Sequence, residues 1–526
     1  MKNQKGFLQG AAILTLSTII VKVIGLFYKV PLQNIVGPSG FGYFTTAYDI
    51  YSILLMFSTT GIPVAISKLV AESVALSDER KAEAYYLVAY KLLIGIGTAG
   101  MLIMILFSKQ LSFLASNTTD ARYAIMVLAP AVLFMCMISA KRGFFQGKSN
   151  MMPTAISQMI EAVCKAFFGI VVSYIIMTKT KNAPLAAGGA IIGVTIGEVC
   201  AAAYMSVSKR RVTKSNRIAN ERSGLVLRRI LLIAVPITVG SVGLQMINFF
   251  DSAIYMRRLT SVLGMSQYDA DELKGIYNFG QSIFNMPCSL ILPLTISLLP
   301  VLSSFYQVND TVNVRKAEKT ALKMTFIIAC PCAIGISFLA QPIIQLLCSN
   351  YTLENIQVST SILRYLGIAV IFNAVVLVTN TMIQAKGNVQ VPVVHMMIGG
   401  LMKLIIDYIL TAQANFNIVG AAIGSLCCYL IIAILNICYL HRGSSLSRQF
   451  LLTCLKPLIA ALLMGGAGCF VYFGIMSGDY SFQNCVIAIG ASAMIYFILI
   501  LCSHVLTKDD LEFMPVLNKK WLTKWL

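Results

Sequence analysis

Two charged residues stand inside a stretch of sequence that otherwise suits a membrane. The segment RGFFQGKSNMMPTAISQMIEAVCK (142–165) places Glu161 and Lys165 after Pro153, a residue favoured in the first turn of a helix. At about 1.5 Å per residue, Glu161 lies roughly 12 Å and Lys165 roughly 18 Å into that helix. A hydrocarbon core is about 30 Å thick, so each charge lies near mid-depth and costs at least about 2.5 kcal/mol there. Two arrangements compensate: the residues form a helical ion pair, or they line a water-filled cavity and bind an anion.

Other ionisable residues in apolar segments pose the same choice. Lys403 and Asp407 repeat the four-residue spacing in the less favourable order. Lys22 and Lys29 share one helix face without a carboxylate within a turn, although Lys29 can also snorkel outward. A cationic cavity fits a phosphate-bearing substrate better than a cationic drug. The candidates for an anion site are Lys22, Lys29, Glu161, Lys165, Lys403 and, near a helix end, Arg364; Asp49, Asp251 and Asp407 are candidates for coupling to Na⁺ or H⁺, with Asp251 equally suited to a charge at the mouth.

Residues for other chemistry are scattered. The fourteen cysteines form no CxxC pair, and Cys330-Pro331-Cys332, which would suit Cu(I), lacks the DKTGT motif of copper-pumping ATPases, so packing at a proline kink is favoured. The three histidines fall in unrelated segments, and no Gly-rich phosphate loop precedes a helix. We expect no enzyme and no cofactor, but a transporter driven by Na⁺, H⁺, membrane potential or substrate supply.

The elements that carry these charges are apolar helices. Of 526 residues 57% are hydrophobic and 12% charged, with a mean hydropathy of +0.78, whereas soluble domains have about 25% charged residues. We predict an all-α integral membrane protein with about fourteen transmembrane helices. Their approximate spans are 7–30, 43–68, 84–107, 123–141, 153–178, 185–207, 229–256, 276–305, 320–340, 359–384, 392–411, 418–440, 457–476 and 485–506.

The net charge of +20 follows the predicted topology. With both termini cytoplasmic, Lys and Arg are about four times as frequent in the inner segments as in the outer loops, which is the positive-inside pattern. This distribution argues against nucleic acid as a partner. We expect a multi-pass protein of the bacterial cytoplasmic membrane, in contact with lipid and monomeric.

Weak matches indicate an internal repeat. QGKSN (146–150) is echoed by QAKGN (384–388), Lys165 by Lys403, and GIPVAIS (61–67) by LPLTIS (292–297). Together they predict two parallel six-helix lobes related by a pseudo-two-fold axis along the membrane normal. The predicted regions are 1–222, an N-lobe ending in the basic linker 209–229; 223–443, a C-lobe; and 444–526, two further helices and an amphipathic cytoplasmic tail, KKWLTKWL.

Four segments carry a family resemblance: VKVIGLFYKVPL (21–32), GPSGFGYFTTAYDIY (37–51), GIPVAISKLVAE (61–72) and RGFFQGKSNMMPTAISQMIE (142–161). Over essentially its whole length the chain resembles the polysaccharide-exporter branch of the MOP flippase superfamily, of the stage V sporulation protein B type and related to MurJ-type lipid II flippases. The resemblance implies two lobes that alternate between inward- and outward-open states. It also implies a lipid-linked glycan substrate of the undecaprenyl-pyrophosphate type.

The resemblance also implies roles for particular residues. The family's basic position in the first helix falls on Lys22, and the motif of helices 4 and 5 falls on Arg142, Gln146, Pro153 and Glu161, with Lys165 as the basic residue that follows. Cavity arginines of MurJ-type flippases have no counterpart in AYDIYSILL or YNFGQSIFNMP, which favours a sporulation-type or general polysaccharide substrate. A cation-coupled multidrug or metabolite antiporter of the same superfamily is the alternative. The sequence leaves open a partner cell-wall synthase.

Overall fold

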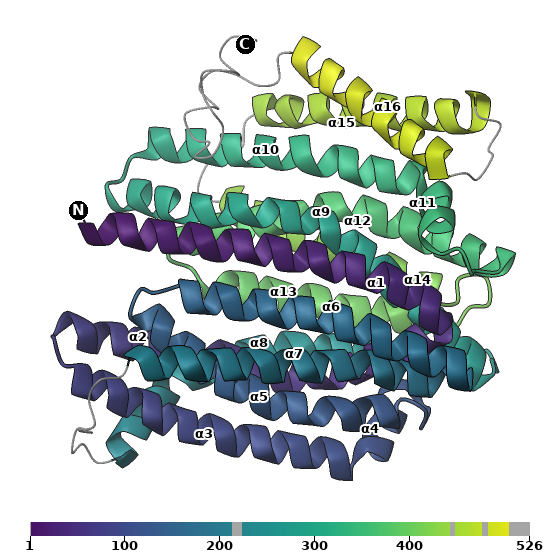
Figure 1. Cartoon of the computed structure of the whole chain (residues 1–526). Helices are drawn as coiled ribbons and strands as arrows, with labels where there is room; N and C mark the ends of the chain where they lie inside the picture. Colours follow the sequence, from purple (N-terminus) through teal and green to yellow (C-terminus); the bar gives the residue numbers. More distant parts are fainter. Residues whose placement is uncertain (1, 213–222, 442–447, 476–481, 504–526) are drawn as a thin grey trace. The chain divides into compact units, whose positions relative to one another are not determined.

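The computed structural model describes residues 2–212, 223–441, 448–475 and 482–503, and within them every regular element is a helix (Figure 1). Thirteen of the described helices are long and apolar enough to cross a membrane. The predicted all-helical membrane fold is therefore confirmed. Most of the linker 209–229, the start of the C-terminal region at 444 and the tail at 519–526 lie outside the described residues.

The chain forms two compact units, Met1–Asn278 and Phe279–Leu526. The division falls within a long helix rather than at the predicted lobe boundary of 222/223, so the two-lobe division stays a prediction. Unit 1 contains α1 (Lys2–Met56), the π-helical turn η1 (Phe57–Gly61), α2 (Ile62–Ala75), α3 (Glu79–Leu106), α4 (Ser108–Ser116), α5 (Arg122–Gly147), α6 (Met152–Thr180), α7 (Ala183–Val212), α8 (Ser223–Ser261) and the start of α9 (Gln267–Gln307). Unit 2 contains the rest of α9, α10 (Thr311–Phe338), α11 (Ala340–Leu347), α12 (Leu353–Ala385), α13 (Gln390–Leu410), α14 (Val419–His441), α15 (Arg448–Cys469), η2 (Phe470–Ile475) and α16 (Phe482–Cys502).

A kink at Gly37 divides α1 into two helices. The apolar part of α1 has 41 residues, about 62 Å at 1.5 Å per residue and twice the thickness of a hydrocarbon core. Gly37 has φ 74° and ψ 175°, a conformation that essentially only glycine adopts. The chain turns back there, because α1 begins at the N label in Figure 1 and α2 lies at that same end. Thirteen apolar helices thus account for fourteen expected crossings.

The contact between α6 and α7 fixes the position of the charged α6 face. A Cβ atom at Gly193 would meet the backbone N of Gly169 and lie 2.8 Å from the carbonyl O of Lys165, and one at Gly197 would lie 2.8 Å from the carbonyl O of Glu161. No side chain fits at either α7 position, so the two backbones touch directly. The turns of α6 that bear Glu161 and Lys165 are therefore held rigidly.

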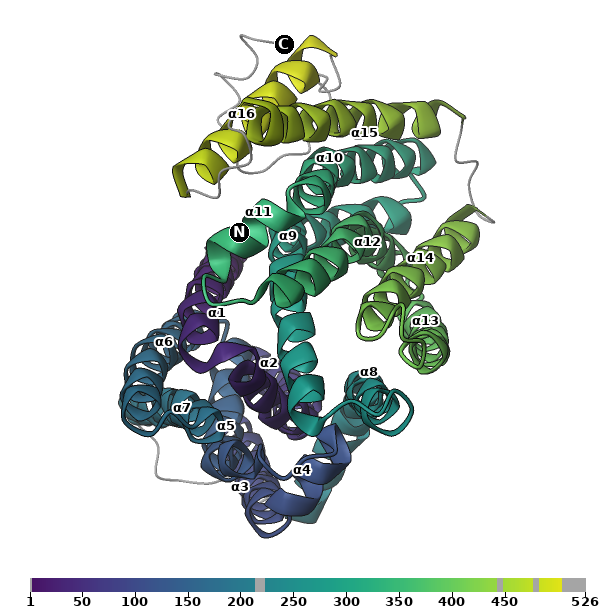
Figure 2. The same ribbon diagram turned by 90° about the vertical axis from the view of Figure 1, so that its right-hand side faces the viewer.

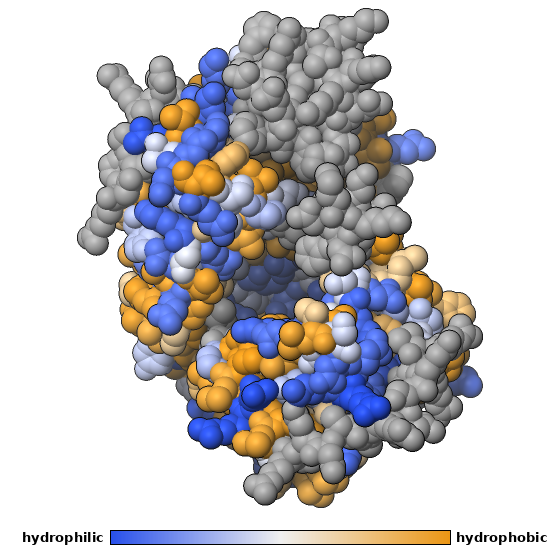
Figure 3. Space-filling model, turned by 90° about the vertical axis from the view of Figure 1, so that its left-hand side faces the viewer, coloured by the Kyte–Doolittle hydropathy of each residue, from blue (hydrophilic) through white to orange (hydrophobic). Residues whose placement is uncertain are grey.

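One end of unit 1 is tied together by ionic contacts. Lys209 Nζ at the end of α7 lies 2.7 Å from Glu83 Oε2 on α3 and 3.6 Å from the ring centroid of Phe144 on α5. Lys148 Nζ pairs with Glu79 Oε2 at 3.2 Å. This end, with the turn between α2 and α3, faces the viewer in Figure 3, where hydrophilic residues (blue) gather. The contacts join α3, α5 and α7 at that end.

Unit 2 is built around α12, which packs against α10 and α14, while α13 packs along α14 (Figure 2). The two C-terminal helices extend this bundle, since α15 packs on α10 and α16 on α15. Tyr496 on α16 donates to the carbonyl O of Ile327 on α10 at 2.9 Å. The last two predicted spans therefore correspond to helices that pack on α10.

Candidate functional site

Three polar side chains lie on successive turns of one α6 face: Ser157, Glu161 and Lys165. Arg142 on α5 reaches the first two, with Nε donating to Ser157 Oγ at 3.0 Å and a terminal nitrogen 3.1 Å from Glu161 Oε2. Of the two arrangements considered for Glu161 and Lys165, the direct ion pair is not formed, because the guanidinium of Arg142 holds the carboxylate instead.

Lys165 is held by aromatic rings. Its Nζ lies 4.7 Å from the ring centroid of Tyr48 and 5.6 Å from that of Tyr28, both on α1. An ammonium over a ring face is stabilised by the ring quadrupole. The positive charges of Lys165 and Lys29 also act on one another. Lys29 and Lys165 are thus two cations of membrane-spanning segments that lie within range of one another's charge.

Glu198 on α7 completes this group. Its side chain is 1% exposed and accepts a long hydrogen bond from the hydroxyl of Tyr51, at 3.4 Å. The charges of Glu161, Arg142 and Lys165 all act on it. We call the five ionisable residues the α6 charge cluster: Lys29, Arg142, Glu161, Lys165 and Glu198.

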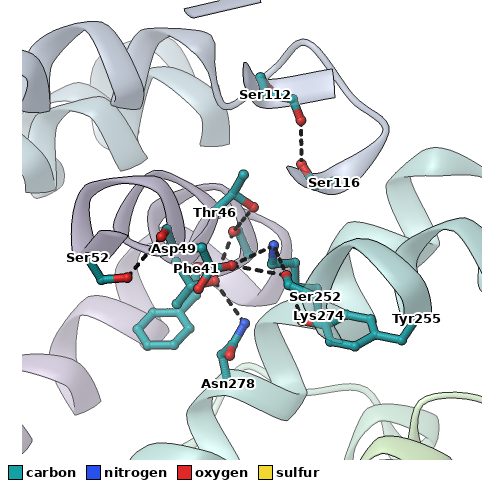
Figure 4. A network of polar contacts seen from close by, with 12 residues as sticks. Phe41, Thr46, Asp49, Ser52, Ser112, Ser116, Ser252, Tyr255, Lys274 and Asn278 are labelled. Carbon is teal, nitrogen blue, oxygen red and sulfur yellow. Dashed lines mark hydrogen bonds and ion pairs between the residues drawn. The ribbon is translucent and has the colours of Figure 1, made fainter. Parts of the chain in front are cut away.

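A second charged group joins α1, α8 and α9 (Figure 4). Lys274 Nζ lies 3.1 Å from Asp49 Oδ2 and donates to Ser252 Oγ at 2.7 Å, and its side chain is fully buried. Ser252 Oγ in turn donates to Asp49 Oδ2 at 3.0 Å and lies 3.2 Å from the hydroxyl of Tyr255. Lys274 Nζ, Asp49 Oδ2 and Ser252 Oγ thus each have a polar partner.

The sequence misplaced Lys274 in an outer loop, and the structure corrects this. The span predicted from residue 276 begins at Gln267 instead, so Lys274 lies within α9. The signal was a capping pair: the hydroxyl of Ser266 accepts from the backbone N–H of Asp269 at 3.2 Å and donates to the Asp269 carboxylate at 2.7 Å. Such pairs mark helix starts.

These contacts concern the aspartates that are candidates for coupling transport to Na⁺ or H⁺. The carboxylate of Asp49 already meets an ammonium, which a soluble cation would have to displace. Asp251 on α8 is buried, 4% exposed. The predicted pair in unit 2 is present, with Lys403 Nζ 3.9 Å from Asp407 Oδ2 and Asp407 fully buried.

The remaining predicted residues lie elsewhere. Lys22 is exposed on α1, two turns before Lys29, and Arg364 is exposed on α12. Cys330 is buried on α10 among apolar residues of α15 and α16, as expected for packing. Across the described ranges, no group of three or more His, Cys, Asp or Glu side chains is placed to hold a metal ion.

Sequence comparisons identify the family. The profile of the polysaccharide biosynthesis protein family matches residues 7–306, more than half of the chain. The chain belongs to this family. A second profile, MatE, matches residues 249–409. The polysaccharide biosynthesis match contains both charged groups of unit 1, whereas Lys403 and Asp407 fall within the MatE match.

The chain is similar over most of its length to three known proteins. It is similar to stage V sporulation protein B of Bacillus subtilis (strain 168), with 22% identity over 98% of both chains. It is also 24% identical to the lipid II flippase MurJ of the same organism, over 79% of this chain and 80% of that one. A solved structure of lipid II flippase MurJ in an inward closed conformation matches 94% of this chain and 99% of its own, with a TM-score of 0.68 and 16% identity. That likeness confirms the fold.

Unit 2 also contains a neutral polar network that the sequence did not reveal. Asn436 on α14 donates to Thr379 Oγ1 at 2.9 Å and to Asn380 Oδ1 at 2.8 Å, and its own Oδ1 lies 2.7 Å from His395 Nδ1. These residues lie on α12, α13 and α14. Three helices of unit 2, α12, α13 and α14, thus share a group of amide, hydroxyl and imidazole side chains.

Proposed function

We propose that this protein is a flippase that moves a lipid-linked glycan precursor of the undecaprenyl-pyrophosphate type, such as lipid II, across the cytoplasmic membrane by alternating access. The family, which is described by polysaccharide biosynthesis, and the similarity to the lipid II flippase MurJ support this substrate class. The observation that carries the proposal is the placement of Lys165. Its ammonium lies over two tyrosine rings and within range of the charge of Lys29, while Arg142 holds Glu161, the carboxylate one turn earlier on α6.

The chemistry follows from the charges. The positive charges of Lys29 and Lys165 repel one another, and a pyrophosphate bound by both would offset that repulsion and accept their hydrogen bonds. Because both are lysines, they act as mobile point charges rather than as a rigid fork. Such a site releases its anion more readily than a bidentate arginine site, as a transporter requires.

The first experiment measures lipid exposure in living cells. Cells depleted of their own lipid II flippase would express this chain, and an external probe would quantify accessible lipid II. Restored exposure and growth are expected. A well-expressed protein that leaves exposure low would exclude lipid II as cargo and direct the assay to other lipid-linked glycans.

Substitutions at Lys165 test the proposed anion site. Lys165→Ala should lower lipid exposure by at least about tenfold at equal expression, whereas Lys165→Arg, which keeps the charge and donors, should retain most of it. Lys179→Ala is the matched control, because Lys179 is exposed in the last turn of the same helix. Full exposure with Lys165→Ala would contradict a role for this residue.

The second candidate function is a cation-coupled antiporter of drugs or metabolites. The MatE match and the burial of Asp251 within its range favour it. It predicts that overexpression raises drug tolerance and that Asp251→Asn abolishes this gain. Unchanged tolerance together with restored lipid exposure would decide for the flippase.

Neither candidate function is enzymatic. We propose further that Na⁺, H⁺ or the membrane potential drives transport. A cell-wall synthase is the kind of partner protein that fits this function. We expect the transport unit to be a monomer. A ligase or polymerase would form a covalent product when the purified protein is given a lipid-linked glycan, and we expect none.

A further inference from the structure

Arg142 makes contacts that decide which partner Glu161 has. A glutamate four residues before a lysine is the favoured order for a helical ion pair, and α6 has this order in Glu161 and Lys165. In the structure the carboxylate instead contacts Arg142 on α5. Something must therefore outcompete the pairing that the α6 sequence favours.

The geometry of the guanidinium supplies the reason. Arg142 bonds Ser157 Oγ through Nε at 3.0 Å and Glu161 Oε2 through a terminal nitrogen at 3.1 Å. The planar fork thus spans two turns of α6. Ser157 lies one turn before Glu161 and Lys165 one turn after it, so this grip directs the carboxylate away from the lysine. Helical side chains lean toward the N-terminus, which also favours this direction for Glu161.

The surroundings of Lys165 complete the arrangement. Its ammonium lies over Tyr48 and Tyr28, contacts that hold the cation without neutralising it. The backbone of α6 is clamped at both charged positions by Gly193 and Gly197 of α7. The choice between the two partners of Glu161 is therefore made by side chains on a fixed helix.

We propose that Arg142 is a positioning residue that holds Glu161 away from Lys165 and so keeps the Lys165 ammonium available to a pyrophosphate. This inference rests on the proposed function and deepens it. Arg142 acts through Glu161 rather than by touching the substrate. Its importance should therefore disappear once residue 161 carries no charge.

A double-substitution experiment tests this dependence. The assay measures binding of radiolabelled undecaprenyl pyrophosphate to purified full-length protein in detergent micelles. Arg142→Gln should weaken binding by at least about tenfold, because Glu161 then pairs with Lys165. Glu161→Gln sets the reference, and Arg142→Gln/Glu161→Gln should bind within about threefold of that reference. Lys179→Ala should bind as the unaltered protein does.

The outcomes separate the two claims. Binding by the unaltered protein that Lys165→Ala abolishes supports the proposed function, and absence of binding would overturn both claims. If the double variant binds at least about tenfold more weakly than Glu161→Gln, Arg142 acts on the anion directly or through Glu198. The positioning role through Glu161 is then wrong, while the flippase proposal stands. If Arg142→Gln does not accumulate, the comparison of the double variant with Glu161→Gln decides alone, because neither carries an unpaired glutamate.

Discussion

At the scale of single residues, Lys165 depends on the face of an aromatic ring. Its Nζ lies 4.7 Å from the centroid of Tyr48, and cation–π contacts contribute about 0.5 to 2 kcal/mol depending on desolvation. Tyr48→Leu should therefore lower lipid exposure severalfold, whereas Tyr48→Phe should preserve it because the ring remains. Equal loss in both variants would assign the effect to the hydroxyl.

The buried pair of Lys274 and Asp49 gives a prediction about stability. Removing one member of a buried ion pair costs about 3–5 kcal/mol, since the other charge is left without compensation. Lys274→Met should lower the unfolding temperature in detergent by several degrees, and Lys274→Met/Asp49→Asn should recover most of the loss. A double variant as unstable as the single one would show that packing, rather than charge, accounts for the effect.

For single residues, the sequence predicted which charges lie in apolar segments but not which residues of other helices they contact. The charges at 161 and 165 were identified because their cost in a membrane does not depend on tertiary structure. The partner of Glu161 was not, because Arg142 lies 19 residues away on another helix, and helical spacing favours Lys165. Tyr28 and Tyr48 were missed for the same reason, because their rings contact Lys165 from a different helix.

At the scale of elements, the direct contact between α6 and α7 should tolerate no side chain. Gly193→Ala would place a Cβ atom 2.8 Å from the carbonyl O of Lys165, and overpacking of this kind costs about 1–3 kcal/mol. We expect a lower unfolding temperature and reduced lipid exposure. Gly188→Ala on the same helix is the control, since its Cβ atom would meet nothing closer than 3.9 Å; similar losses in both variants would contradict the clamp.

Element positions were predictable where hydropathy alone decides them. Each predicted span overlaps a described apolar helix, because about 20 apolar residues have few alternatives to a helix in lipid. Helix ends were less predictable. The polar start of α9, QYDADELKG, was assigned to a loop, although Asp271 and Lys274 are buried there, because burial by neighbouring helices leaves no mark in local hydropathy.

At the scale of the whole molecule, the predicted repeat can also be compared through the residues of the two polar groups. Asn380 and Asn436 of unit 2 stand 238 positions after Arg142 and Glu198 of unit 1, the same offset that relates Lys165 to Lys403. In both units these residues lie on helices that bear a polar group. If the halves share an ancestor, unit 1 has kept ionisable side chains where unit 2 has amides. At these two positions the polar contacts would be ionic in unit 1 and neutral in unit 2, while Lys403 and Asp407 remain a charged pair of unit 2.

The orientation of the chain is the broadest prediction, and two introduced cysteines can test it. Asn150 and Ser349 are exposed in turns between helices, and the fourteen-crossing topology places residue 150 in the cytoplasm and residue 349 outside. A membrane-impermeant maleimide added to intact cells should therefore label Ser349→Cys, and should label Asn150→Cys only after the cells are opened.

The unaltered protein supplies the control for the outer position. Native Cys348 is buried, and burial raises the pKa of its thiol to about 12. Because the thiolate is the reactive form, Cys348 should not be labelled, and label on the Ser349→Cys variant in excess of that on the unaltered protein belongs to the introduced thiol. Five apolar helices separate residues 150 and 349, so the two sites must lie on opposite sides whichever way the protein inserts. A reporter at the N-terminus on the same side as residue 150 would show that α1 crosses the membrane twice, and one on the opposite side would show that the kink at Gly37 does not return the chain.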